Sequence, residues 1–127
     1  MGFCLLNNVA IAARWLRSQG LERMLNVHWD LHHGNGTQDI FYTDPAVYYL
    51  SLHQYPLYPG TGHPEERGLG AGAGTTLNVH VTEGTDGPTW LQLLEPALDQ
   101  VLAEFSPDFL LVSAGFDNLG ADPLGGL

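Results

Sequence analysis

The sequence predicts an α/β protein in which a parallel β-sheet carries helices on both faces. Three observations lead to this prediction. Short apolar runs typical of strands alternate along the chain with segments of helical periodicity, as in parallel sheets. The last such run, residues 108–113, has an unbroken apolar stretch at residues 109–112, as expected for a strand that is buried on both faces. Only 14% of the 127 residues are charged and 44% are hydrophobic, which is enough for one buried core.

The first half of the chain predicts a helix, a strand, a short helix and a second strand. Residues 7–19 place apolar side chains on one helical face and stop at Gly20, a common helix terminator. Residues 24–29 form a short apolar run, consistent with a buried strand. Residues 37–42 suit a short helix that an Asp-Pro pair ends, and residues 46–53 are β-branched and aromatic, which favours a strand.

The second half predicts a long loop, a strand, a helix and a last strand. Residues 54–73 are rich in glycine and proline, and loops of this length in compact domains are usually functional or disordered. A third strand follows at residues 76–81. Residues 88–105 repeat apolar side chains at helical spacing and begin with a proline, which suits a first helical turn. Residues 108–113 form the fourth strand.

Charge and cysteine content exclude several functions. The formal net charge is −10, and the few basic side chains are all arginines. Direct nucleic-acid binding is therefore not expected, because phosphate backbones need clustered positive charge. The acidic surface suits a basic protein tail or a polyamine, or serves solubility alone. Cys4 is the single cysteine, so the chain has no internal disulfide. Since neither a signal peptide nor an apolar run of ~18 residues occurs, we expect a cytoplasmic protein that does not enter a membrane.

Two of the predicted strands end in side chains that bind metals. Asp30 and His32 follow the first strand, and Asp117 follows the fourth. Residues two apart in extended backbone project to the same side, and the carboxyl ends of parallel strands form a common ligand-binding edge. One imidazole and two carboxylates predict a three-ligand catalytic zinc site with an open position, where Fe²⁺ or Co²⁺ could substitute. Because two carboxylates neutralise the ion, such an enzyme needs a separate general base and an oxyanion donor.

Three separated motifs then give a specific resemblance. HWDLHHGNGTQDIFY, SLHQYPLYPGTG and SAGFDNLGADPLGG, preceded by GFCLLNNVAIAA, resemble successive blocks of the histone deacetylase and acetylpolyamine amidohydrolase superfamily, closest to its class II and bacterial branches. The resemblance runs from Gly2 to Leu127 in the order and spacing of that family. It implies the arginase/deacetylase-type fold, a parallel sheet with helices on both faces.

By position, the resemblance also implies the binding residues. Zinc would be bound by Asp30, His32 and Asp117. The acyl-lysine tunnel would have aromatic walls at Phe3 and Tyr58, where the family usually has a second Phe, and the Gly2 carbonyl would meet the substrate amide. A structural potassium would be bound by the backbone carbonyls of Asp30 and His32 with Ser51 and Leu52, and a second monovalent cation by Phe41, Asp44 and Val47. Leu124 stands where polyamine-preferring relatives have an acidic residue, which favours acyl-lysine.

The sequence departs from the family in three places. The tandem histidines of the family, its general base and electrostatic partner, precede the first block, and its transition-state tyrosine follows the last, so neither lies in this chain. We therefore expect an internal fragment of a deacetylase domain, truncated at both ends and inactive alone. His28 stands where the family has an aspartate that binds potassium and orients an upstream histidine. This exchange is either tolerated or the mark of a decayed site.

These observations predict a zinc-dependent deacylase that hydrolyses N-acetyl-lysine in proteins or peptides, or an acetylated small amine. The alternative is a non-catalytic, truncated or decayed deacetylase-like module that only binds metal. A binuclear manganese ureohydrolase is disfavoured, because His33 and Asn118 stand where extra bridging carboxylates would be needed. We expect His33 and His53 to serve buried hydrogen bonding rather than catalysis.

Overall fold

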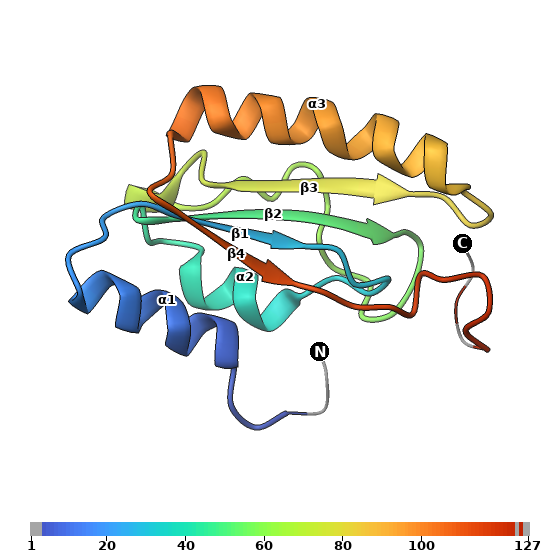
Figure 1. Ribbon diagram of the computed structural model, residues 1–127, viewed down its shortest axis with the longest axis horizontal. Helices are drawn as coiled ribbons and strands as arrows, with labels where there is room; N and C mark the ends of the chain where they lie inside the picture. Colours follow the sequence, from blue (N-terminus) through green and yellow to red (C-terminus); the bar gives the residue numbers. More distant parts are fainter. Residues whose placement is uncertain (1–3, 124, 126–127) are drawn as a thin grey trace.

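The computed structural model describes residues 4–123 and 125, and it contains one parallel sheet with helices on both faces (Figure 1). The elements in chain order are α1 (Asn8–Ser18), β1 (Met24–His28), α2 (Asn35–Phe41), β2 (Val47–Gln54), the 3-10 turn η1 (Gly70–Gly72), β3 (Thr76–Val81), α3 (Gly87–Phe105) and β4 (Phe109–Ser113). The predicted α/β class is confirmed. Each predicted helix and strand is present, and its ends differ from the prediction by a few residues at most.

The sheet has the strand order β3-β2-β1-β4, and all its strand pairs are parallel. The chain moves outward from β1 through β2 to β3, then returns across the sheet on α3 to place β4 on the other side of β1 (Figure 1). The strand order therefore reverses between β1 and β4. In open α/β sheets, ligands bind beyond the carboxyl ends of the strands at such a reversal.

Each face of the sheet is covered by different helices. On one face α3 packs Leu94, Ala97 and Val101 onto apolar side chains of β1, β2 and β3. On the other face α1 and α2 enclose a smaller cluster that contains Met24 and Val47 (Figure 1). The central strands β1 and β2 are buried along their whole length, so the backbone that leads into the site is held from both sides.

The two longer helices begin at side-chain caps. The Asn7 side chain accepts from the Ala10 N–H at the start of α1, and the Asp86 side chain accepts from the Thr89 N–H at the start of α3. Such caps satisfy backbone donors that a helix leaves unpaired at its first turn. The α3 helix ends at Ser106, whose left-handed φ of 48° turns the chain toward β4.

The expectation that the last strand is buried on both faces is wrong for this chain. Phe109, Leu110 and Val112 in β4 are 42%, 53% and 41% exposed. The physical reason is the cover of the sheet, because α3 packs onto apolar side chains of β1, β2 and β3 but, among the described residues, onto none of β4, which lies on the far side of β1. Among the described residues, no helix is long and apolar enough to cross a membrane.

The long glycine-rich segment after β2 is ordered by polar side chains of the sheet. The carbonyl of Gly62 accepts from both His53 Nε2 and His80 Nε2, at 3.1 and 3.0 Å. At Gly62, φ is +84° and a Cβ would lie 2.6 Å from the His33 ring, so a side chain would not fit. The loop is therefore fixed close to the carboxyl end of the sheet.

Candidate metal centre

Three side chains converge where the strand order reverses. Asp30 and His32 lie just beyond β1, and Asp117 lies beyond β4, which pairs directly with β1. One ligand atom from each lies within 4.8 Å of the other two. The His32 Nδ1 atom is 2.8 Å from Asp117 Oδ2 and 3.2 Å from Asp30 Oδ1. The sequence predicts that these three residues lie together, and the structure places them side by side; that they bind a metal stays a prediction.

Backbone N–H groups hold both carboxylates in place. The His32 N–H donates to Asp30 Oδ1 at 2.8 Å, a local turn in which an aspartate accepts from the residue two positions later. The Leu31 N–H donates to Asp117 Oδ1 at 3.0 Å and so joins the two loops directly. Leu31 itself is 1% exposed, and its carbonyl accepts from the Gln54 N–H on β2. The ligand loop is therefore fixed to the sheet on both sides.

Two further residues of the β4 loop position the site. A Cβ added at Gly115 would lie 2.4 Å from Asp30 Oδ2, so only glycine allows the loop to approach this carboxylate. The Asn118 side-chain N–H donates to the Trp29 carbonyl at 3.1 Å. Sequence reasoning did not assign these roles. The signal was available in the glycine and asparagine that flank the predicted ligand in SAGFDN.

The donor set suits a divalent cation. In a tetrahedral zinc site, ligand bonds of 2.0–2.2 Å place ligand atoms about 3.4 Å apart. The 2.8 and 3.2 Å separations at His32 Nδ1 are near that spacing. All three residues are half-buried, so a small molecule can still reach the site from solvent. A second metal, as a ureohydrolase requires, is not supported, since the described residues contain one such group of three ligands.

His28 ends β1 and lies beneath the metal-ligand loop. Its side chain is 6% exposed, and its Nε2 is 2.9 Å from the His32 carbonyl oxygen. A carbonyl only accepts, so Nε2 carries the proton in this contact. Burial lowers the pKa of His28, which favours a neutral imidazole.

His33 and His53 serve hydrogen bonding, as expected from the sequence. His33 contacts Thr61 Oγ1 through Nδ1 at 2.7 Å and Gln38 Oε1 through Nε2 at 3.0 Å. The Nε2–H of His53 donates to the Gly62 carbonyl, which leaves Nδ1 to accept from the Ser51 hydroxyl at 2.9 Å. Burial lowers the pKa of both imidazoles, that of His53 to about 3. Neither ring is free to act as a general base.

The other predicted binding residues lie in several places. Tyr58 is on the loop after β2 and is 63% exposed, and its role as a substrate wall stays a prediction. Gly2, Phe3 and Leu124 lie outside the described residues. Ser51 and Leu52 are buried in β2 beside the end of β1.

The expected second cation site lies in the turn between α2 and β2, at the amino end of β2 and so opposite the metal ligands. The Phe41 carbonyl accepts from the Asp44 N–H at 2.9 Å, and the Asp44 carbonyl accepts weakly from the Val47 N–H at 3.5 Å. The carboxylate of Asp44 pairs with Arg14 and Arg17 on α1, so its charge is already balanced. The cation at Phe41, Asp44 and Val47 stays a prediction.

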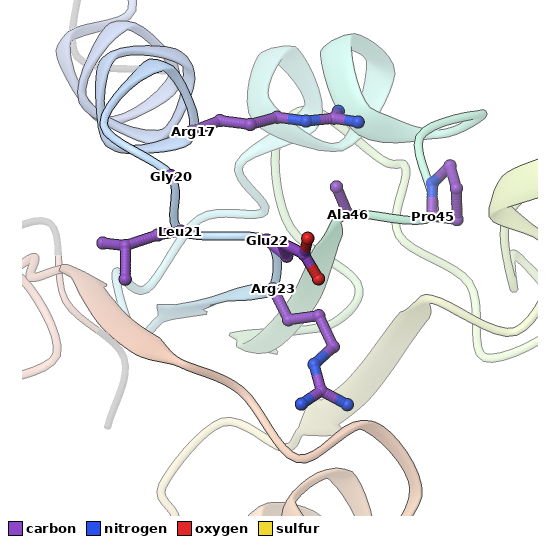
Figure 2. A pocket seen from close by; sticks show the side chains of 7 residues that line it. All are labelled: Arg17, Gly20, Leu21, Glu22, Arg23, Pro45 and Ala46. Atoms are coloured by element: carbon purple, nitrogen blue, oxygen red, sulfur yellow. The ribbon is translucent and has the colours of Figure 1, made fainter.

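A surface hollow of about 520 Å³ lies away from the metal centre. Figure 2 shows that its lining comes from the end of α1 and the residues that precede β1 and β2. Those residues lie at the amino ends of the strands, whereas Asp30, His32 and Asp117 follow the carboxyl ends. Its two arginines, Arg17 and Arg23, already pair with carboxylates.

Comparison with known proteins assigns the family. The histone deacetylase domain matches residues 1–127, so the chain belongs to the histone deacetylase family. It is 49% identical over 123 residues to a probable deacetylase from Archaeoglobus fulgidus, covering 97% of this chain and 34% of that protein. It is also 46% identical to histone deacetylase 9 from Homo sapiens, covering 99% of this chain and 14% of that one.

A solved structure gives the same assignment. The crystal structure of an HDAC homolog from Aquifex aeolicus matches with a TM-score of 0.95 at 37% identity, covering 100% of this chain and 35% of that one. The predicted superfamily and arginase/deacetylase-type fold are therefore confirmed. The chain spans about a third of the length of these relatives, or less.

Proposed function

We propose that this chain supplies the zinc-binding core of a deacylase that hydrolyses N-acetyl-lysine or a related N-acyl amine. The observation that carries the proposal is the convergence of Asp30, His32 and Asp117 at the strand-order reversal. When bound, zinc supplies a Lewis acid that polarises the acyl carbonyl and acidifies water. Fe²⁺ and Co²⁺ suit the same oxygen-rich ligands.

The residues of the chain would hold and orient the reacting groups. The two carboxylates and the imidazole would hold the ion, and the Leu31 and His32 N–H groups keep both carboxylates in place for it. Tyr58, with Phe3 and Gly2, would contact the acyl-lysine side chain, as the family resemblance implies. One of the solved relatives is an acetylpolyamine aminohydrolase from Burkholderia pseudomallei, which supports an acetylated amine as the substrate class.

Catalysis also needs a proton acceptor, and the two imidazoles nearest to the ligands in sequence do not offer one. The imidazoles nearest to the ligands in sequence are engaged, His28 with the His32 carbonyl and His33 with Thr61 and Gln38. We therefore expect the 127 residues alone to bind the ion without turnover. Within a longer protein, a base from another segment would complete the site.

Two measurements test this function. Zinc titration followed by calorimetry should give one ion per chain, and Asp117→Asn should weaken binding at least about 100-fold, because it removes a charged ligand. Asp99→Asn on the exposed side of α3 is the control and should bind as wild type. Acetate release from an acetyl-lysine peptide should require a longer protein that contains this chain, stop after chelation and return with zinc. Chelator-resistant release, or wild-type zinc affinity in Asp117→Asn, would contradict the proposal.

A further inference from the structure

The residues around His28 do not fit the potassium ion that the family resemblance implies. That ion would be bound by the carbonyls of Asp30 and His32, with Ser51, Leu52 and a carboxylate at position 28. In this chain position 28 carries an imidazole, and its Nε2 lies 2.9 Å from the His32 carbonyl oxygen. A proton on Nε2 and a cation would compete for the same oxygen, and an imidazole does not supply the negative charge that a buried cation needs.

The imidazole is held in this orientation by its surroundings. His28 is in register with Ser51 on β2 and Ser113 on β4, so strands pair with its backbone on both sides. On the loop side, a Cβ at Gly34 would lie 2.7 Å from the imidazole Cε1 and 2.9 Å from its Nδ1. The ring therefore packs directly against backbone, and only a glycine at position 34 permits this approach.

Ser51, another expected potassium ligand, has an internal partner as well. Its hydroxyl donates to His53 Nδ1 at 2.9 Å, because His53 Nε2 already donates to Gly62. A hydroxyl that donates keeps its oxygen lone pairs, so this bond orients Ser51 but does not by itself exclude a cation; the imidazole at position 28 does. The His32 carbonyl belongs to the metal-ligand loop, so the His28 bond acts on that loop directly.

We propose that the Nε2–H of His28 takes the place of the structural monovalent cation and fixes the metal-ligand loop without potassium. The histidine then replaces both the aspartate and the cation that the aspartate would bind, because its N–H supplies the partial positive charge that the His32 carbonyl oxygen would otherwise receive from the cation. The exchange is compatible with an intact zinc site. This inference concerns the structural cation alone. It stands or falls separately from the deacylase function, because its test measures stability and cation binding rather than turnover.

The test compares thermal unfolding in potassium chloride and in choline chloride at equal ionic strength. Wild-type protein should unfold at the same temperature in both salts, within about 1 °C. His28→Asp removes the internal donor and restores a carboxylate, so it should unfold earlier in choline and gain about 4 °C or more in potassium, as expected for binding to the folded state. Thallium(I) binding, a probe for potassium sites, should be detected in His28→Asp and not in wild type.

Two controls separate the hydrogen bond from the charge. His28→Gln retains a neutral side-chain N–H and should stay indifferent to potassium. His63→Asp places a new carboxylate at a half-buried histidine on the loop after β2 and should not create a potassium response. Potassium-dependent stability or thallium binding in the wild type would overturn the proposal, and this comparison decides it even if His28→Asp does not fold. A folded His28→Asp that ignores potassium would overturn it too, since the imidazole would not be what replaces the cation.

Discussion

The buried imidazole of His53 makes the stability of this fold sensitive to acid. His53 is 1% exposed, and burial, with the neighbouring His33 and His80, lowers its pKa from 6.5 to about 3. An unfolded chain takes up a proton at this position near pH 6.5, whereas the folded chain does not until about pH 3. The stability of the folded state should therefore fall as the pH drops below 6.5, and the loss should level off near pH 3.

The size of the effect follows from the two pKa values. Protonation of the unfolded state alone costs the fold RT ln(1 + 10^(6.5 − pH)), which is close to zero at pH 8 and about 2 kcal/mol at pH 5. His53→Gln removes the titrating group but retains an N–H that can donate to the Gly62 carbonyl. The loss of unfolding free energy between pH 8 and pH 5 should thus be about 2 kcal/mol smaller in His53→Gln than in wild type.

Urea unfolding followed by tryptophan fluorescence at both pH values measures this difference. His80→Gln is the matched control, because His80 donates to the same carbonyl from a half-buried position. Its unfolding free energy shows what losing the imidazole bond to the Gly62 carbonyl costs while the buried His53 ring stays in place. If wild type and His53→Gln lost stability equally between pH 8 and pH 5, the reasoning from burial would be refuted.

Two further predictions follow from close packing. Gly115→Ala should weaken zinc binding about 10- to 100-fold, because the new Cβ would displace the Asp30 carboxylate. Gly36→Ala is the control and should bind zinc normally, since a Cβ at position 36 would meet open space. Calorimetric titration with zinc measures both affinities. Val101→Ala in the core of α3 should lower the unfolding free energy by about 2 kcal/mol, and the half-exposed Leu102→Ala by less than about 1 kcal/mol, as urea unfolding would show. Equal zinc affinities of the two glycine variants, or equal losses of unfolding free energy in Val101→Ala and Leu102→Ala, would contradict this packing.

The sequence predicted the architecture well because its signals are local. Hydrophobic runs, helical periodicity and glycine or proline at element ends specify β1 to β4 and the three helices without reference to distant residues. The exposure of β4 was not predictable in this way. An apolar run such as residues 108–113 indicates a strand, but its burial depends on which elements the rest of the protein places beside it.

The candidate site was predictable in composition but not in detail. Spacing and strand ends pointed to Asp30, His32 and Asp117, and the pairing of β1 with β4 brings them together. Backbone N–H groups hold both carboxylates, and no side-chain pattern encodes such contacts. The close approach of Gly115 to Asp30 did have a signal, the glycine of SAGFDN, but its role depends on the fold. The bond from His28 to the His32 carbonyl was missed for the same reason, since it depends on the orientation of one ring.

The reversal of strand order has a consequence for how the protein folds. His32 and Asp117 are 85 residues apart in sequence, so the ligand set is complete only after α3 has crossed the sheet and β4 has paired with β1. Closing so long a loop carries an entropic cost that local helices and turns do not have. We therefore expect the ion-binding geometry to form late in folding, and an ion that binds it selectively would stabilise the pairing of β4 with β1.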